Sequence, residues 1–201
     1  MDKKADEIIV LEEWLNMNKA HFRLLIVISV LADIKLAFRG KISDLCDEIG
    51  IQPSSVNKRN TEVALNYLKE NEYVKVLEDN DIYTVSLSAA AEKSKNVKVI
   101  KKAWYQLIKD AKSDAAWDAI LKTFVYLYSI SSDMCITQDD IAEKLGVGKS
   151  TIGRCIRTLK KLRFPCVGDM ILNAKEMKRI DEKGNIRSVG TKYEFVIEFK
   201  E

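Results

Sequence analysis

One stretch in the second half of the chain carries side chains that could bind a polyanion. Its candidate contact residues are Lys149, Ser150, Thr151, Arg154, Arg157 and Lys161. Arg154, Arg157 and Lys161 are three or four residues apart, so a helix would present them on one face. Residues 144–163 include seven Lys or Arg and no Asp or Glu. Exposed Arg and Lys on a helix contact DNA phosphates and base edges, so this pattern predicts binding to double-stranded DNA.

A second group of basic residues follows in a charged segment that we expect to form a β-hairpin. Its strands are predicted at about residues 175–181 and 186–199, around a turn at 182–185. The candidate DNA contacts in this hairpin are Lys178, Arg179, Lys183 and Arg187. Such side chains suit contacts with backbone phosphates, although a solvated surface hairpin also accounts for them.

The first half of the chain contains a weaker candidate. The front of a helix expected at about residues 54–71 carries Ser54, Ser55, Lys58 and Arg59. Acidic residues follow in the same helix, and the tip of the next predicted hairpin is the acidic run 78–81. Carboxylates at a hairpin tip repel phosphate. We therefore hypothesise that this half either binds DNA lightly or serves as a protein-interaction or dimerisation module.

Other kinds of chemistry have little support in the residues. His21 is the only histidine, and no Cys or His residues have the spacing of metal ligands. Residues 146–151 (GVGKST) resemble the end of a phosphate-binding P-loop, but Glu143 occupies the position where that loop requires Gly. A helix is also expected where the P-loop requires a strand. The sequence therefore predicts a protein that is not an enzyme and has neither cofactor nor metal.

Two predicted helices position the basic residues. A short helix over about residues 137–144 is followed by a tight turn at 145–147 and a second helix over 149–162. The apolar residues Ile152, Cys155, Ile156, Leu159 and Leu162 recur with the 3.6-residue period of a helix, which predicts a buried face opposite the basic one. A short helix, a Gly turn and a helix with one apolar and one basic face form the helix-turn-helix pattern.

The segment 124–164 resembles the winged helix-turn-helix modules of bacterial and phage DNA-binding proteins. The resemblance is carried by DIAEKLGV (140–147), KSTIGR (149–154) and IRTLKKL (156–162). It implies a recognition helix that enters the major groove, a β-hairpin wing, and a role as a sequence-specific transcription regulator. The segment is also similar to winged-helix modules of plasmid and phage replication proteins, which implies replication initiation as an alternative. A winged-helix scaffold that binds protein is a third possibility.

The helix-turn-helix pattern occurs twice in the chain. Residues 44–56 align without a gap on residues 140–152, 96 positions later, and this alignment pairs Val56 with Ile152. Further along, residues 67–69 match 158–160 only if the first copy has five extra residues in its second helix. We therefore expect two tandem winged-helix domains joined by a helical linker, in a fold that is mainly α with small β-hairpin wings (α+β).

The expected domain boundaries follow from this repeat. Domain 1 covers residues 1–88 and includes an N-terminal helix, a basic linker helix covers 89–113, and domain 2 covers 114–201. The N-terminal segment has an apolar stripe that either packs on domain 1 or forms a homodimer contact, and it consists of Ile8, Ile9, Leu11, Trp14 and Leu15.

Composition limits the compartment and the partners. The four cysteines form no CxxC pair and the N-terminus has no signal-peptide layout, so we expect reduced thiols in a cytoplasmic protein. The most apolar stretch, residues 24–31, is too short to cross a bilayer. The expected partner is double-stranded DNA, with a possible homodimer and no membrane.

Overall fold

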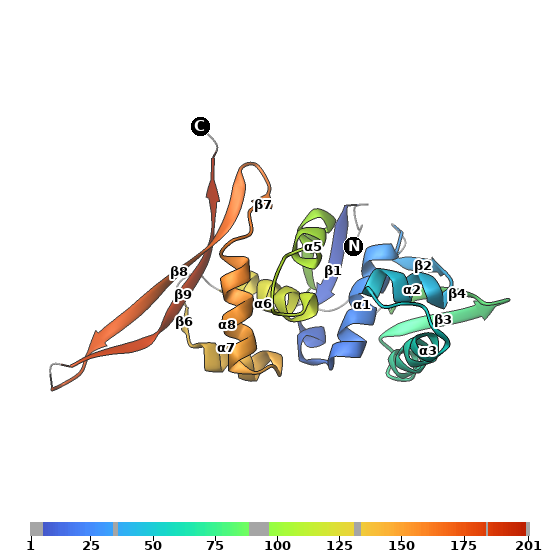
Figure 1. Cartoon of the computed structure of the whole chain (residues 1–201), viewed down its shortest axis with the longest axis horizontal. Helices are drawn as coiled ribbons and strands as arrows, with labels where there is room; N and C mark the ends of the chain where they lie inside the picture. Colours follow the sequence, from blue (N-terminus) through green and yellow to red (C-terminus); the bar gives the residue numbers. More distant parts are fainter. Residues whose placement is uncertain (1–5, 34–35, 89–96, 131–133, 184, 200–201) are drawn as a thin grey trace. The chain divides into compact units, whose positions relative to one another are not determined.

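The computed structural model describes residues 6–33, 36–88, 97–130, 134–183 and 185–199 (Figure 1). Contacts divide the chain into two units, residues 1–102 and residues 103–201. About 46% of the described residues are helical and 31% lie in strands, which form three sheets. The fold is therefore α+β with a large strand content. The prediction of a mainly α fold with small wings is wrong.

Unit 1 (residues 1–102) packs its helices around a buried apolar core. The helices are η1, a 3-10 helix (Glu12–Asn16), α1 (Lys19–Leu31), α2 (Ile42–Ile49) and α3 (Ser55–Glu70). The side chains of Asn18 and Ser54 cap α1 and α3 by accepting a backbone N–H from the first helical turn. α2 ends at Gly50, whose φ of 86° lies in the left-handed region that favours glycine.

Unit 1 also contains two antiparallel sheets. Strands β2 (Ala37–Gly40), β4 (Ile82–Leu87) and β3 (Val74–Asp79) form one sheet in the order β2-β4-β3. β3 and β4 are joined by a two-residue turn in which Asn80 and Asp81 both have positive φ, as a tight hairpin requires. The second sheet pairs β1 (Glu7–Leu11) with β5 (Val97–Lys101), and Ile9 is opposite Val99.

The pairing of β1 with β5 corrects two predicted helices. The expected N-terminal helix begins with a strand, and the expected linker helix is a strand until α5 begins at Lys102. Residues 89–96 of that linker lie outside the described residues. Periodicity misleads here because a short apolar run can be a buried strand or a helix. The N-terminal apolar stripe is buried within the chain, so it offers no exposed homodimer contact.

The helices of unit 2 (residues 103–201) include the predicted helix–turn–helix pair. They are α5 (Lys102–Lys109), α6 (Trp117–Ser129), α7 (Gln138–Leu145) and α8 (Lys149–Leu159). α7 begins with a capping box, in which Thr137 and Asp140 each accept a hydrogen bond from the other's backbone N–H. α7 ends at Gly146, whose φ is 62°. The predicted buried face of α8 is confirmed for Ile152, Cys155, Ile156 and Leu159, whereas Leu162 lies beyond the end of the helix and is half-buried.

A four-stranded antiparallel sheet completes unit 2 in the order β6-β9-β8-β7. Its strands are β6 (Cys135–Ile136), β7 (Phe164–Pro165), β8 (Asp169–Ile180) and β9 (Ile186–Glu198). β9 has nearly the predicted bounds of 186–199, whereas β8 begins at Asp169, six residues before the predicted start, so the hairpin is longer than predicted on its first strand (Figure 1). An aromatic cluster extends from the core of this unit to its surface. Trp104, Phe124 and Phe164 are buried, Phe195 is half-buried and Tyr128 is exposed.

The buried faces of α3 and α8 fix the register of the internal repeat. α8 buries residues 152, 155, 156 and 159, and α3 buries residues 61, 64, 65 and 68 with the same spacing. α3 has 16 residues and α8 has 11, so the first copy is five residues longer, as predicted. The counterpart of Ile152 is nevertheless Thr61. Pairing Ile152 with Val56 is wrong, because the start of α3 extends past the core and leaves Val56 66% exposed.

Candidate nucleic-acid interface

α8 presents a basic surface on the side opposite its buried face. Ser150 is exposed in its first turn, and Arg157 and Lys161 are exposed farther along the same side. Among the described residues, no ion pair involves Arg157, Lys160 or Lys161. These cations are therefore available to a polyanion without the cost of breaking an intramolecular pair.

Arg154 differs from these residues because it is folded back against the protein. Its Nη2 donates to Thr151 Oγ1 at 3.1 Å, and its Nη1 donates to the backbone oxygen of Asp114 at 3.4 Å. Its Nε is buried and has no hydrogen-bond partner among the described residues. A side chain that reads base edges must extend from the helix into the groove. This geometry therefore makes Arg154 and Thr151 poor base readers and better suited to shaping the surface.

A hollow of about 330 Å³ lies beside the C-terminal half of α8. It is lined by Lys112, Ser113, Asp114, Arg154, Arg157, Thr158 and Lys161. The hollow thus brings together three of the predicted contact residues, Arg154, Arg157 and Lys161. The segment 112–114 and Thr158 were not predicted, because residues 112–114 precede α6 and are distant in sequence from α8. Only a structure can reveal that juxtaposition.

Two other cations near α8 are engaged by carboxylates. Lys149 Nζ lies 2.6 Å from Asp139 Oδ2, which links the first turn of α8 to α7. Arg163 Nη1 lies 2.7 Å from Glu198 Oε2 of β9, and this pairing raises the pKa of the Arg163 guanidinium. Both pairs are well exposed, so solvent screening keeps their contribution to stability small. The predicted contact residue Lys149 is therefore shared between a carboxylate of its own chain and any incoming phosphate.

The predicted contacts of the hairpin are exposed, and they too lie close to acids. Lys178 Nζ is 3.7 Å from Glu176 Oε2, and Arg187 Nε is 2.9 Å from Asp181 Oδ2. The backbone N–H groups of Asn185 and Lys183 donate to the carboxylate of Asp181 and lower its pKa. A hollow of about 470 Å³ at the hairpin tip brings together Arg179, Lys183 and Arg187 with Asp181 and Glu182. The hairpin is therefore a less purely basic surface than α8.

In unit 1 the predicted contact residues lie at the front of α3. Ser54 caps the helix through its hydroxyl oxygen, and Ser55, Lys58 and Arg59 are exposed. The rest of the outward face of α3 is apolar rather than basic: Val56, Val63 and Tyr67 are 66%, 61% and 43% exposed. The acidic residues 78–81 occupy the β3–β4 hairpin tip, as predicted. The two units therefore present different chemistry on corresponding helices.

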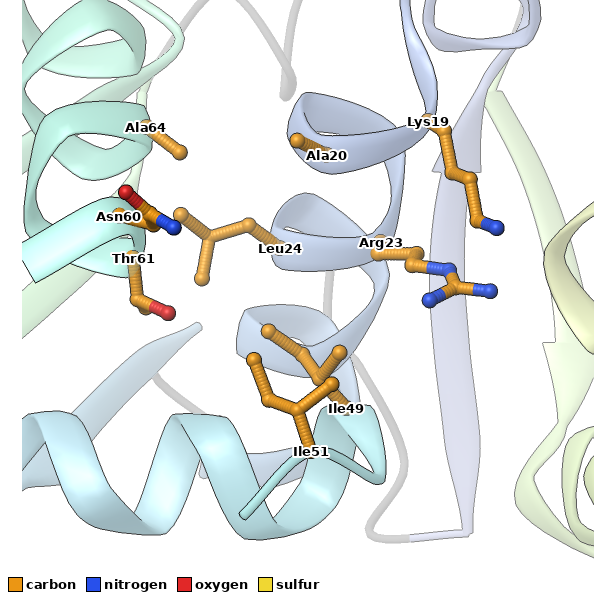
Figure 2. A pocket seen from close by; sticks show the side chains of 9 residues that line it. All are labelled: Lys19, Ala20, Arg23, Leu24, Ile49, Ile51, Asn60, Thr61 and Ala64. Carbon is orange, nitrogen blue, oxygen red and sulfur yellow. The ribbon is translucent and has the colours of Figure 1, made fainter. Parts of the chain in front are cut away.

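A small apolar hollow in unit 1 lies between α1, α2 and α3 (Figure 2). Its volume is about 210 Å³, and Leu24 extends into it from α1. Arg23 extends to the other side of α1, away from Asn60 (Figure 2). The hydroxyl of Thr61 in the lining already donates to Asn57 O. This hollow offers aliphatic packing space and little polar recognition, so it is a weaker candidate site than the basic hollow.

No family model, curated protein or solved structure matches the chain. Among the helices that the structure describes, none is long and apolar enough to cross a bilayer. The assignment of a function therefore rests on the chemistry of the surfaces described above.

Proposed function

We propose that unit 2 is a double-stranded DNA-binding module in which α8 enters the major groove. The observation that supports this proposal is the exposed face of α8, where Arg157, Lys160 and Lys161 have no carboxylate partner among the described residues. An α-helix fits the width of the major groove, and cations along it replace the counterions of the phosphates.

The two ends of the α8 surface have different expected tasks. Ser150 and Arg157 extend from the exposed side of the helix and are the candidates for contacts with base edges. Lys160 and Lys161, together with Lys178 and Arg179 of the hairpin, are placed to contact backbone phosphates. This arrangement corresponds to a winged helix-turn-helix reader in the cytoplasm. A sequence-specific transcription regulator is the favoured role, and a replication initiator of the plasmid or phage type is the alternative.

Selection from a pool of random DNA duplexes tests this proposal directly. The wild-type protein should enrich one motif, and Arg157→Ala should lose or relax it at one or two positions. Lys75→Ala, which removes one exposed cation from unit 1, is the matched control and should leave the motif unchanged. With about six phosphate contacts, affinity should fall roughly a thousandfold between about 50 and 200 mM salt. A pool that remains random after selection would contradict the proposal.

A second candidate function, protein docking by unit 1, is favoured by the exposed apolar stripe on α3. Val56, Val63 and Tyr67 are spaced seven and four residues apart, so they align along three turns of the helix. Charges of both signs lie on the same helix, Lys58, Arg59 and Lys69 against Glu62 and Glu70, so they set no preference for the sign of a partner's charge. The stripe therefore suits a partner helix with an apolar ridge.

A helical peptide with a Leu ridge can test this docking surface. The peptide should bind, and Val63→Ser should weaken its affinity about tenfold. Val189→Ser, at an exposed valine of the unit 2 hairpin, is the control. An equal loss of affinity in both variants, or no binding by the wild type, would refute the docking surface.

A further inference from the structure

The basic hollow of unit 2 has the composition of an anion site. Four cations line it, namely Lys112, Arg154, Arg157 and Lys161, against one carboxylate, that of Asp114. No ion pair among the described residues involves Lys112, Arg157 or Lys161. Cations gathered around one hollow repel one another, and a bound anion removes that repulsion.

Hydrogen bonds fix the wall of the hollow. Ser113 Oγ and Thr158 Oγ1 are 2.7 Å apart, which joins the segment before α6 to α8. Thr158 Oγ1 also lies 3.1 Å from Arg154 O, and Arg154 Nη1 donates to Asp114 O on the opposite side. The hydroxyl groups and the guanidinium are thus held in place before any ligand arrives. Preorganised donors lose little conformational entropy on binding.

We infer that this hollow is a phosphate-binding site and that it seats one phosphodiester group of the DNA backbone. The inference rests on the proposed function and adds that the residues of this hollow bind phosphate and do not read bases. Arg154, which the sequence suggests as a base reader, helps to form a phosphate seat instead. The exposed ammonium groups of Lys112 and Lys161 supply the charge. Ser113 donates to Thr158 Oγ1 and Thr158 donates to Arg154 O, so these hydroxyl groups hold the wall of the hollow in place and leave the phosphate to the cations.

Unit 1 provides an internal comparison for this site. In the register set by the buried faces, Arg154, Arg157, Thr158 and Lys161 correspond to Val63, Asn66, Tyr67 and Glu70. Tyr67 stacks on His21 with ring centroids 3.9 Å apart. An aromatic pair therefore occupies the position where unit 2 has its paired hydroxyl groups. The repeated helix pair does not by itself create a phosphate site, because these side chains occur only in unit 2.

The first test measures duplex affinity as a function of salt for Lys112→Ala, Lys161→Ala and the double variant. If Lys112 and Lys161 hold the same phosphate, losing one lysine or both removes one phosphate contact. Each single variant and the double variant should therefore lower the slope of log affinity against log salt by about one. Two independent phosphates would lower it by about two. The control, Lys69→Ala with Lys75→Ala in unit 1, removes the same charge and should leave the slope unchanged.

Sequence preference is the second readout of the same experiment. A phosphate contact positions DNA without reading bases, so the motif enriched by the double variant should equal that of the wild type. A slope change of about two, an unchanged slope or an altered motif would each overturn the inference. Circular dichroism should report wild-type folding, because both lysines are exposed.

A titration with inorganic phosphate distinguishes the DNA backbone from a small phosphate ligand. Amide NMR signals of Ser113 and Thr158 should shift with phosphate but not with chloride at equal ionic strength, and the shifts should vanish in the double variant. Phosphate-dependent shifts with an unchanged DNA slope would overturn the assignment to the backbone. Phosphate-dependent shifts in a wild-type protein that binds no DNA would refute DNA binding but leave the phosphate site. DNA binding without phosphate-dependent shifts would refute the phosphate site but leave DNA binding.

Discussion

Neutralising Asp139 should strengthen DNA binding, because this residue competes with DNA for Lys149. The Nζ–Oδ2 distance of 2.6 Å places Lys149, a predicted contact at the start of α8, in an ion pair with α7. Lys149 must leave that pair, at least in part, to contact a phosphate. In Asp139→Asn the competing charge is gone, while the side chain keeps its size.

The magnitude follows from the exposure of the pair. Both side chains are more than 60% exposed, so the pair contributes about 0.2–1 kcal/mol. Removing that cost should tighten DNA binding by about 1.5- to 5-fold at low salt. If Lys149 then contacts one additional phosphate, the slope of log affinity against log salt should become steeper by about 0.9. A fluorescence anisotropy titration at four salt concentrations measures both quantities.

The control is Glu143→Gln, which removes one negative charge from the same helix. Glu143 is exposed and takes part in none of the ion pairs among the described residues. Equal strengthening in both variants would reduce the effect to net charge and refute the reasoning about Lys149. Weaker binding by Asp139→Asn, with wild-type thermal stability, would mean that the ion pair orients α8 instead of competing with DNA.

Three further predictions concern the stability of unit 2. Thr137→Ala removes the capping box of α7 and should lower the free energy of unfolding by about 1 kcal/mol in urea titrations. Hydrogen bonds from the backbone N–H and the hydroxyl of Thr137 hold the pKa of the Asp140 carboxyl below its ordinary value of 3.8. Their contribution to stability is therefore present above that pH and lost as the pH falls through the folded-state pKa, and an acid titration of Asp140→Asn should lack this component. Burial raises the pKa of the Cys155 thiol to about 11, so iodoacetamide at pH 8 should label exposed Cys135 first and Cys155 only after unfolding, as mass spectrometry would report. Phe164→Ala opens the aromatic core and should cost about 3–5 kcal/mol by the same urea titration, so a loss below about 1 kcal/mol would contradict the described packing.

Sequence reasoning succeeded where local chemistry decides the structure. The Gly turn at 145–147 and the 3.6-residue period of α8 are local signals, and the helix pair α7–α8 has nearly the predicted bounds. The acidic β3–β4 hairpin of unit 1 was predicted for the same reason, because alternating strands flank a short polar turn.

Prediction failed where distant segments decide the structure. No local pattern in the residues of β1 predicts that this strand pairs with β5, about ninety residues later. The first six residues of β8 were missed, although the rest of the hairpin was predicted, because only pairing with the end of β9 extends this strand back to Asp169. Arg154 has the spacing of a base reader, and only the position of Asp114 reveals that its guanidinium folds back. The basic hollow was missed for the same reason.

The pairing of β1 with β5 has a consequence for synthesis on the ribosome. Residues 8–11 form an apolar run that emerges early, yet its partner strand is not complete until Lys101 has been translated. An unpaired apolar strand is prone to aggregate during that interval. Nascent chains that contain β1 but end before β5 should therefore recruit hydrophobic-binding chaperones, and release should coincide with the emergence of β5. The β1–β5 sheet is therefore the last part of unit 1 that can form during translation.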